Sequence, residues 1–145
     1  MVMLQVQTRH FGTLSIDESE VIRFEQGILG FEDVHEYVLL GDREQTPFFW
    51  IQSVDGSDVS MIVADPFSLY PDYAVNLDDP EVASLEIKNP DKVLSLSVVI
   101  IPKDIRQMRA NLKAPLIINL ENNKGMQVVQ YNDDLPLQFF LIQEA

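Results

Sequence analysis

Carboxylates are the side chains of this 145-residue sequence that could most readily do chemistry, since 23 Asp and Glu stand against 10 Lys and Arg. The run Asp55-Gly56-Ser57-Asp58 partly matches a calcium-binding loop. An EF-hand loop, however, needs oxygen ligands at alternate positions before its glycine and a glutamate further on. Here the glycine directly follows the first aspartate. We therefore interpret this run as a turn, and paired carboxylates elsewhere in so acidic a chain say little about acid–base catalysis.

The residue types that other catalytic and metal sites need are missing or isolated. The chain has no cysteine, and His10 and His35 occur in neither an HExxH nor a His-x-His spacing. Gly27 and Gly30 lack the spacing and the following Lys-Ser/Thr of a phosphate-binding loop, and no G-x-S-x-G nucleophile motif occurs. The sequence predicts a protein that is not an enzyme and that uses no metal ion or cofactor.

The net charge of -13 indicates which kinds of partner the protein can bind. RNA and DNA binding needs Lys and Arg to neutralise phosphates, so direct nucleic-acid binding is not expected. An acidic protein is suited to approach a basic partner, although the charge could equally serve solubility alone. Residues 88–113 differ, because six Lys and Arg against two Asp give them a net charge of +4 and leave -17 for the remainder. Three cations of residues 103–113 are expected to form ion pairs within the protein, namely Arg106, Arg109 and Lys113. The alternative is that they bind an acidic group of a partner.

Composition and length predict one domain over residues 1–145. A hydrophobic fraction of 46% with 23% charged residues is ordinary for a soluble globule. The longest apolar runs are far too short to cross a membrane. Residues 1–12 lack the basic start and the cleavage site of a signal peptide. We expect a cytoplasmic protein that does not contact a membrane.

Strand signals dominate the chain. Alternation and short apolar runs between turn residues predict strands at 3–7, 13–17, 21–24, 37–40, 48–54, 59–64, 92–101, 116–120 and 126–131. Trp50, centred in one of these strands, is expected in the core. Asp55-Gly56 suits a tight hairpin turn, and residues 122–125 predict a second hairpin. Residues 25–32 form a loop in which we expect two glycines to take backbone angles that other residues resist.

A short helix is expected after Asp78 or Asp79, either of which can cap it, with Pro80 in its first turn. Residues 139–142 could close a sheet edge or cover the core. In the strand 92–101 one face should be shared by Leu94, Leu96, Val98 and Ile100. Many short strands with tight turns and one or two short helices predict a mostly β fold. We expect a single-domain antiparallel β-barrel-like fold, with a strongly bent sandwich as the alternative.

An aromatic connection follows the strand 59–64. Pro66 and Pro71 prevent a long helix there, and exposed aromatic groups often form recognition surfaces. We expect a platform for binding another protein, made of Asp65, Phe67, Tyr70, Asp72 and Tyr73. Two structural alternatives stay open. Asp65 could merely cap the turn, and for Phe67 a plug at the end of the barrel is the stronger interpretation.

Three segments of the chain resemble the FliW family of flagellar assembly factors: GTLSIDESEVIRFEQGILGFEDVHEYVLL, TPFFWIQSVDGSDVSMIVADPFSLYPDY and ANLKAPLIINLENNKGMQVV. They contain the family patterns IxFxxGIxGF, PFxxLQS, DPF and ANLxAPxxIN, in the family's order and across most of the chain. Leu29 and Ile51 stand where proline and leucine are common, and residues 132–145 lack the basic ending of some relatives. Asn111 and Asn119 lie in the last motif, where hydrogen bonds in buried turns explain them at least as well as partner contacts.

The resemblance implies a β-barrel-like regulator without catalytic activity. It implies that the protein binds the translational regulator CsrA and antagonises RNA binding by CsrA. It also implies that the protein alternatively binds flagellin, so that flagellin level controls flagellin translation. A body of charge -13 docked beside an RNA-binding surface would repel phosphates without covering that surface.

On the matched motifs, partner contacts are expected in the turn and on the platform, at Asp55, Gly56, Ser57, Asp58, Asp65, Phe67, Tyr70, Asp72 and Tyr73. Two other classes of protein remain as alternatives. One is a small-ligand-binding β-barrel without a regulatory partner, which needs a cavity with converging polar groups. The other is a hydrolase, which needs two carboxylates that face each other across a cleft.

Overall fold

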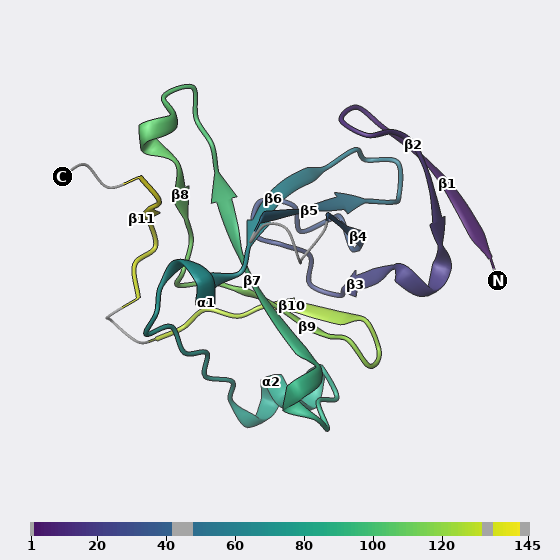
Figure 1. Cartoon of the computed structure of the whole chain (residues 1–145). Coiled ribbons are helices and arrows are strands. Elements are labelled where there is room, and N and C mark those ends of the chain that lie inside the picture. The colour runs from purple at the N-terminus through teal and green to yellow at the C-terminus, as the bar shows by residue number, and fades with distance from the viewer. Residues whose placement is uncertain (1, 42–47, 132–134, 143–145) are drawn as a thin grey trace.

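The computed structural model describes residues 2–41, 48–131 and 135–142. The described strands are β1 (Met3–Thr8), β2 (Gly12–Asp17), β3 (Ile22–Phe24), β4 (Glu36–Leu40), β5 (Phe48–Ser53), β6 (Ser60–Ala64), β7 (Val93–Ile100), β8 (Arg109–Ala110), β9 (Leu116–Asn119), β10 (Lys124–Gln127) and β11 (Phe139–Phe140). Two short α-helices and three single-turn 3-10 helices connect them: α1 (Pro66–Leu69), α2 (Asp79–Ser84), η1 (Glu18–Glu20), η2 (Pro90–Lys92) and η3 (Ile105–Gln107). Figure 1 shows these elements along the chain.

Seven of these strands close into a barrel. The sheet order is β11-β8-β7-β6-β5-β4-β3-β10-β9, and β9 pairs back onto β7. The pairing of β10 with β3 is parallel, whereas the other pairs in this sheet are antiparallel. Closure leaves no free edge within the barrel, which removes the usual template for strand-to-strand aggregation. The predicted antiparallel β-barrel-like fold is confirmed.

Local sequence signals set most of the elements. The predicted hairpin between β5 and β6 is confirmed by the pairing of Gln52 with Ser60, and Gly56 has the expected positive φ of 93°. Asp78 caps α2, because its side chain accepts a hydrogen bond from the Glu81 backbone N–H while the Glu81 side chain accepts one from the Asp78 N–H. Pro66 begins α1, which has four residues, so the connection indeed carries no long helix.

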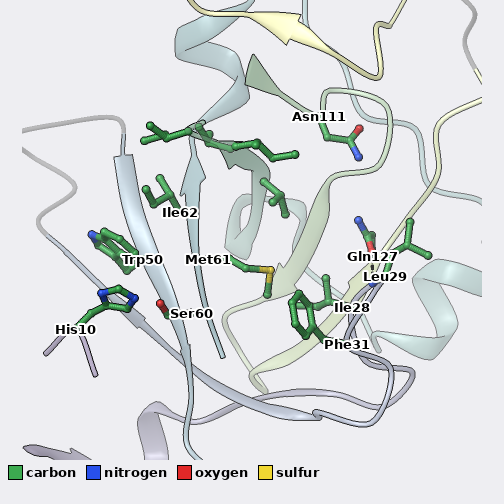
Figure 2. Close-up of a pocket in the computed structure, with 14 residues that line it drawn as sticks. His10, Ile28, Leu29, Phe31, Trp50, Ser60, Met61, Ile62, Asn111 and Gln127 are labelled. Carbon is green, nitrogen blue, oxygen red and sulfur yellow. Dashed lines mark hydrogen bonds between the residues drawn. The ribbon is translucent and has the colours of Figure 1, made fainter. Parts of the chain in front are cut away.

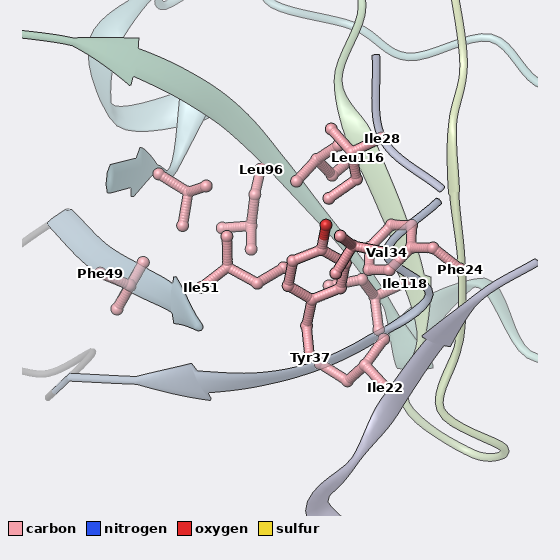
Figure 3. Close-up of a cluster of buried hydrophobic side chains, with 11 residues drawn as sticks. Ile22, Phe24, Ile28, Val34, Tyr37, Phe49, Ile51, Leu96, Leu116 and Ile118 are labelled. Carbon is pink, nitrogen blue, oxygen red and sulfur yellow. The ribbon is translucent and has the colours of Figure 1, made fainter. Parts of the chain in front are cut away.

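The barrel interior is filled by apolar side chains from opposite walls (Figure 3). Phe24 and Tyr37 are both fully buried, and their rings meet edge to face with centroids 5.7 Å apart. The cluster consists of Ile22, Phe24, Ile28, Val34, Tyr37, Phe49, Ile51, Val63, Leu96, Leu116 and Ile118. Alternation along the strands directs nine of these residues inward, as the sequence pattern predicts. The other two, Ile28 and Val34, come from the loop between β3 and β4.

The two ends of strand β7 pair with different strands. Its first half pairs with β9 in the barrel, and its last two residues pair with β8. The hairpin that joins β7 to β8 extends away from the barrel (Figure 1). Leu96 is therefore buried on the inner face, whereas Ile100 on that same face is 50% exposed. The predicted shared face is correct, but its last residue lies beyond the barrel.

Additional layers cover the outside of the barrel. The β1–β2 hairpin packs on the outer face of β4 through Val6, Ile16 and Val38, and the end of α2 packs on β9 through Leu85 and Ile117. These layers explain why both faces of several strands are apolar. Phe139 pairs with Ala110 of β8, so the C-terminal segment closes a sheet edge, one of its two predicted roles. No helix in the described residues is long and apolar enough to span a membrane.

Candidate partner-binding surfaces

The turn at Asp55–Asp58 uses its polar groups within the protein. Asp55 accepts hydrogen bonds from the Ser57 backbone N–H (3.0 Å) and the Ser57 hydroxyl (2.6 Å), which hold the pKa of this carboxyl below its usual value. The Arg9 backbone N–H donates to Asp58 at 3.2 Å, and the Arg9 guanidinium lies 3.6 Å from the other carboxylate oxygen. The turn is thus tied to the segment that joins β1 to β2.

Asp65 caps α1, as the structural interpretation of the sequence proposes. Its carboxylate accepts hydrogen bonds from the Phe67 backbone N–H at 3.0 Å and from the Ser68 hydroxyl at 3.2 Å. Asp72 follows Pro71 and is exposed. Asp65 therefore has a structural role as the helix cap. A contact between Asp65 and a partner stays a prediction.

The three aromatic residues of the connection differ in exposure. Phe67 is 51% exposed and Tyr70 is half-buried against the ring of Phe139. Tyr73 is 5% exposed, and its hydroxyl donates to the Leu112 carbonyl at 3.0 Å. The prediction of an exposed Tyr73 is wrong, because the chain 39 residues further on covers it. The prediction that Phe67 plugs the barrel is also wrong, since its ring packs edge-on against Tyr73 outside the barrel.

The two buried tyrosines should differ in how much stability is lost when the hydroxyl is removed. Tyr73→Phe removes the hydrogen bond to Leu112 and should lower the free energy of unfolding by about 1 kcal/mol. Tyr37→Phe should cost nothing measurable, because the buried Tyr37 hydroxyl has no hydrogen-bond partner among the described residues. Urea unfolding at pH 8 checks both, and an equal loss in the two variants would contradict the contrast.

Burial raises the pKa of both tyrosines from 10.0 to about 12. The folded state therefore holds protons that the unfolded state releases near pH 10. Stability from this source is complete below pH 10 and is lost as the pH rises toward 12. Each Tyr→Phe variant should accordingly lose less stability than the parent between pH 9 and pH 11, measured by urea unfolding.

The turn and the platform do not form one surface. They lie at opposite ends of β6, which separates them by roughly 13 Å at about 3.3 Å per residue. The predicted site residues therefore define two separate regions. Two apolar grooves, which the sequence analysis does not predict, lie near them.

The first groove, here called the α2 groove, has a volume of about 500 Å³. It lies between α2 and the outer face of β7 and β9. Among the predicted site residues, Phe67 alone lines it. The lining consists of Phe67, Val75, Leu77, Val82, Ile87, Lys88, Pro90, Val93, Ser95 and Ile117.

The second groove, here called the mouth groove, has a volume of about 470 Å³ (Figure 2). It is lined by His10, Ile28, Leu29, Phe31, Trp50, Ser60, Met61, Ile62, Val98, Val99, Ile100, Ile101, Asn111 and Gln127. Trp50 is only half-buried, and its ring lies 5.8 Å from that of His10 and 5.3 Å from that of Phe11. Its predicted place in the core is wrong, because alternation along β5 points it outward, away from the inward-facing Phe49 and Ile51.

Polar side chains fix the walls of the mouth groove. The Gln127 side chain accepts a hydrogen bond from the Leu29 backbone N–H at 2.8 Å and donates to the Ala114 carbonyl at 3.1 Å. Asn111 accepts from the backbone N–H groups of Lys113 and Ala114, both at 3.0 Å. Asn111 thus stabilises a turn, in agreement with the structural alternative for this residue.

The basic stretch after β7 is partly paired. Arg106 donates to both carboxylate oxygens of Asp104, at 3.1 and 3.2 Å, and these bonds lower the pKa of the Asp104 carboxyl. Internal pairing is confirmed for this residue. Arg109 donates to the Gln107 carbonyl at 3.1 Å, whereas its buried Nε has no hydrogen-bond partner in the described part of the chain.

The described residues contain no group of three His, Asp or Glu side chains placed to hold a metal ion. The surface carries two open apolar grooves on a closed barrel. Such grooves are suited to bind segments of other proteins. The structure thus defines a small closed β-barrel protein with apolar grooves on its surface.

Comparison with known proteins specifies that class. The family model described as "FliW protein" matches residues 5–141. A flagellar assembly factor FliW of Thermoanaerobacter pseudethanolicus is 39% identical over 142 residues, which cover 97% of this chain and 95% of the relative. That of Caldicellulosiruptor saccharolyticus is 40% identical over 138 residues, covering 95% and 90%. A crystal structure of the flagellar assembly factor FliW superposes with a TM-score of 0.87 at 32% identity and covers 97% of this chain and 98% of that one. The chain belongs to the FliW family.

Proposed function

We propose that this chain is a cytoplasmic, non-enzymatic regulator of flagellar assembly that acts as one domain over residues 1–145. It binds the translational regulator CsrA and antagonises RNA binding by CsrA, and it alternatively binds flagellin. Free flagellin would then release CsrA to repress flagellin translation, and export of flagellin would reverse this. The supporting observation is membership of the FliW family across residues 5–141.

The charge of the chain supports a mechanism for the antagonism. A protein of net charge -13 that docks next to an RNA-binding surface repels incoming phosphates without covering that surface. Exposed charges are screened over about 8 Å at physiological ionic strength. Acidic clusters near the RNA path should therefore matter, and distant ones should not. Two candidate clusters are 17–20, around η1, and 78–79, at the start of α2.

Amide variants separate charge from structure in these clusters. Asp17 and Asp78 cap η1 and α2, and an amide at the cap position keeps that hydrogen bond. The variants Asp17→Asn/Glu18→Gln/Glu20→Gln and Asp78→Asn/Asp79→Asn should therefore fold normally. In at least one of them we expect RNA displacement from CsrA to weaken severalfold while affinity for CsrA is unchanged. Both quantities are measured at fixed salt, since salt alone weakens RNA binding. If every acidic cluster can be neutralised without loss of inhibition, repulsion is the wrong mechanism.

For flagellin, we propose that an amphipathic helical segment binds in the α2 groove. Helix-in-groove recognition needs an apolar wall with an exposed anchor. Phe67 supplies the exposed anchor, and the half-buried Val82 is part of the apolar wall. Of the other predicted contacts, Tyr73 is unsuited to a direct role because it is buried. The turn Asp55–Asp58 remains a proposed contact. Three residues of the platform, Asp65, Tyr70 and Asp72, also remain proposed contacts.

Phe67→Ala tests this placement of flagellin. The ring is half exposed, so truncation should leave the fold intact and weaken flagellin binding about tenfold or more, as for an interface anchor. Tyr131→Ala is the matched control, because Tyr131 is 91% exposed and lies outside the groove. Isothermal titration with purified flagellin measures both. If both variants bind flagellin as tightly as the parent chain does, the flagellin site lies elsewhere on the protein. If the parent chain itself does not bind flagellin, the proposed function is wrong.

A further inference from the structure

The mouth groove continues the core of the barrel out to solvent. The inner face of β7 passes from buried Leu96 to half-exposed Ile100, and Ile101 follows with 47% exposure. On the opposite wall, the loop between β3 and β4 presents Leu29 at 76% and Phe31 at 40% exposure. Figure 2 shows Phe31 and Leu29 on one side of the groove, with Met61 between them and Trp50. Large apolar side chains gathered in a groove mark an interaction site more strongly than scattered ones.

The two walls carry opposite charge. The hairpin over residues 100–109 has three cations, Lys103, Arg106 and Arg109, against one anion, Asp104, in a chain of net charge -13. The other wall, residues 28–33, has two acidic residues, Glu32 and Asp33, and no cation. The hairpin is thus a basic segment in an acidic chain, and it directly follows the exposed Ile100 and Ile101 of the mouth groove.

Two cations of this wall, Lys103 and Arg109, form no ion pair with the described residues. Arg109 pairs with Ile100 across β7 and β8, so the two side chains share the face that borders the groove. The Arg109 side chain is half-buried and donates to the Gln107 carbonyl, and its Nε is buried without an acceptor in the described chain. Lys103 is exposed and has no ion-pair partner among the described residues. Arg106, by contrast, is held by Asp104.

We propose that the mouth groove binds an amphipathic helical segment of a partner protein. Its apolar stripe packs between the two walls, with acidic residues along the edge that faces Lys103 and Arg109. Basic residues lie along the other edge, toward the acidic loop. Because the two edges differ in charge, the helix lies in one direction only.

A helix fits this groove better than an added strand. The lining strands are already paired on both sides, since Ile62 pairs with Trp50 and Val99, and Val99 pairs with Ala110 as well. An added strand would need an unpaired row of backbone groups, whereas a helix needs side-chain contacts alone. The proposal concerns a different surface from the α2 groove and does not depend on which proteins are the partners of this chain.

The test uses a synthetic helical peptide of about five turns. Its Leu stripe follows the spacing i, i+3, i+4, i+7, with Glu along one edge and Lys along the other. A control peptide carries Gln at both edges. We expect the charged peptide to bind about fivefold more tightly than the control at low salt. Lys103→Gln/Arg109→Gln should reduce that advantage without removing it, because the Lys edge of the peptide still faces the acidic loop. Ile100→Ser/Ile101→Ser should weaken both peptides about tenfold.

Matched variants make the result specific. Arg106→Gln on the same hairpin should change affinity less than twofold, and Val82→Ser in the α2 groove should not change it at all. Circular dichroism and thermal unfolding confirm that each variant folds. The proposal is overturned if both peptides bind equally, or if the isoleucine variants bind as the parent does. It is also overturned if sedimentation shows that the parent chain covers this groove with a second copy of itself.

Discussion

Replacing Gly125 by alanine should destabilise the barrel by about 3 kcal/mol, the upper part of the range for overpacked cores. A Cβ at this position would lie 2.6, 2.7 and 2.9 Å from three ring atoms of Phe24. That ring is fully buried and packs against Tyr37, so it has no space in which to move. A melting temperature lower by roughly 10 °C is expected for a chain of this length. Thermal and urea unfolding measure the change.

Two further variants identify the clash as the cause. Gly30→Ala adds a methyl group where nothing lies within 4 Å, although its φ of +91° is unfavourable for alanine. It should therefore cost only about 1 kcal/mol, from backbone strain. Phe24→Leu shortens the ring that the new methyl group meets. Combined with Gly125→Ala, it should cost less than the sum of the two single changes. Additive costs would show that the methyl group and the ring do not collide.

The elements of this fold follow from local signals. Alternation along β1, β2 and β6 and the turn at Asp55-Gly56 place strands within one or two residues of their bounds. The cap at Asp78 fixes the start of α2 in the same way. Each of these signals acts over a few residues, so it can be interpreted without knowledge of the tertiary structure.

The surfaces, in contrast, depend on contacts between distant segments. Tyr73 is buried because Leu112 crosses it, and Trp50 lines a groove beside His10, which lies 40 residues earlier in the chain. The mouth groove combines side chains from the β1–β2 turn, the β3–β4 loop, four strands (β5, β6, β7 and β10) and the segments that follow β7 and β8. No window of the sequence contains that arrangement. The exposed pair Ile100-Ile101 before Pro102 is the one local sign of the groove, and on its own it is indistinguishable from the end of a buried strand.

Replacing Asn119 by alanine should cost about 3 kcal/mol, because three hydrogen bonds of a buried side chain are lost. The Asn119 amide is 1% exposed, donates to the carbonyls of Leu85 (2.9 Å) and Glu86 (3.3 Å), and accepts from the Glu121 backbone N–H (3.1 Å). Those carbonyls follow α2, where Glu86 has a φ of +53°. Urea unfolding measures the loss, and a loss below about 1 kcal/mol would contradict it.

Asn119→Asp distinguishes hydrogen bonding from packing at this position, because the side chain keeps its shape. The amide donor is replaced by a carboxylate oxygen, which would face the two carbonyl oxygens of Leu85 and Glu86 without a hydrogen between them. Burial and these carbonyls should raise the pKa of the new carboxyl in the folded state above its unfolded value. The variant should then be least destabilised at low pH, where the carboxyl is protonated, and should lose stability as the pH rises through the folded pKa. A pH-independent deficit would indicate packing instead. Since α2 forms one wall of the α2 groove, both variants should weaken peptide binding in that groove and leave the mouth groove unaffected.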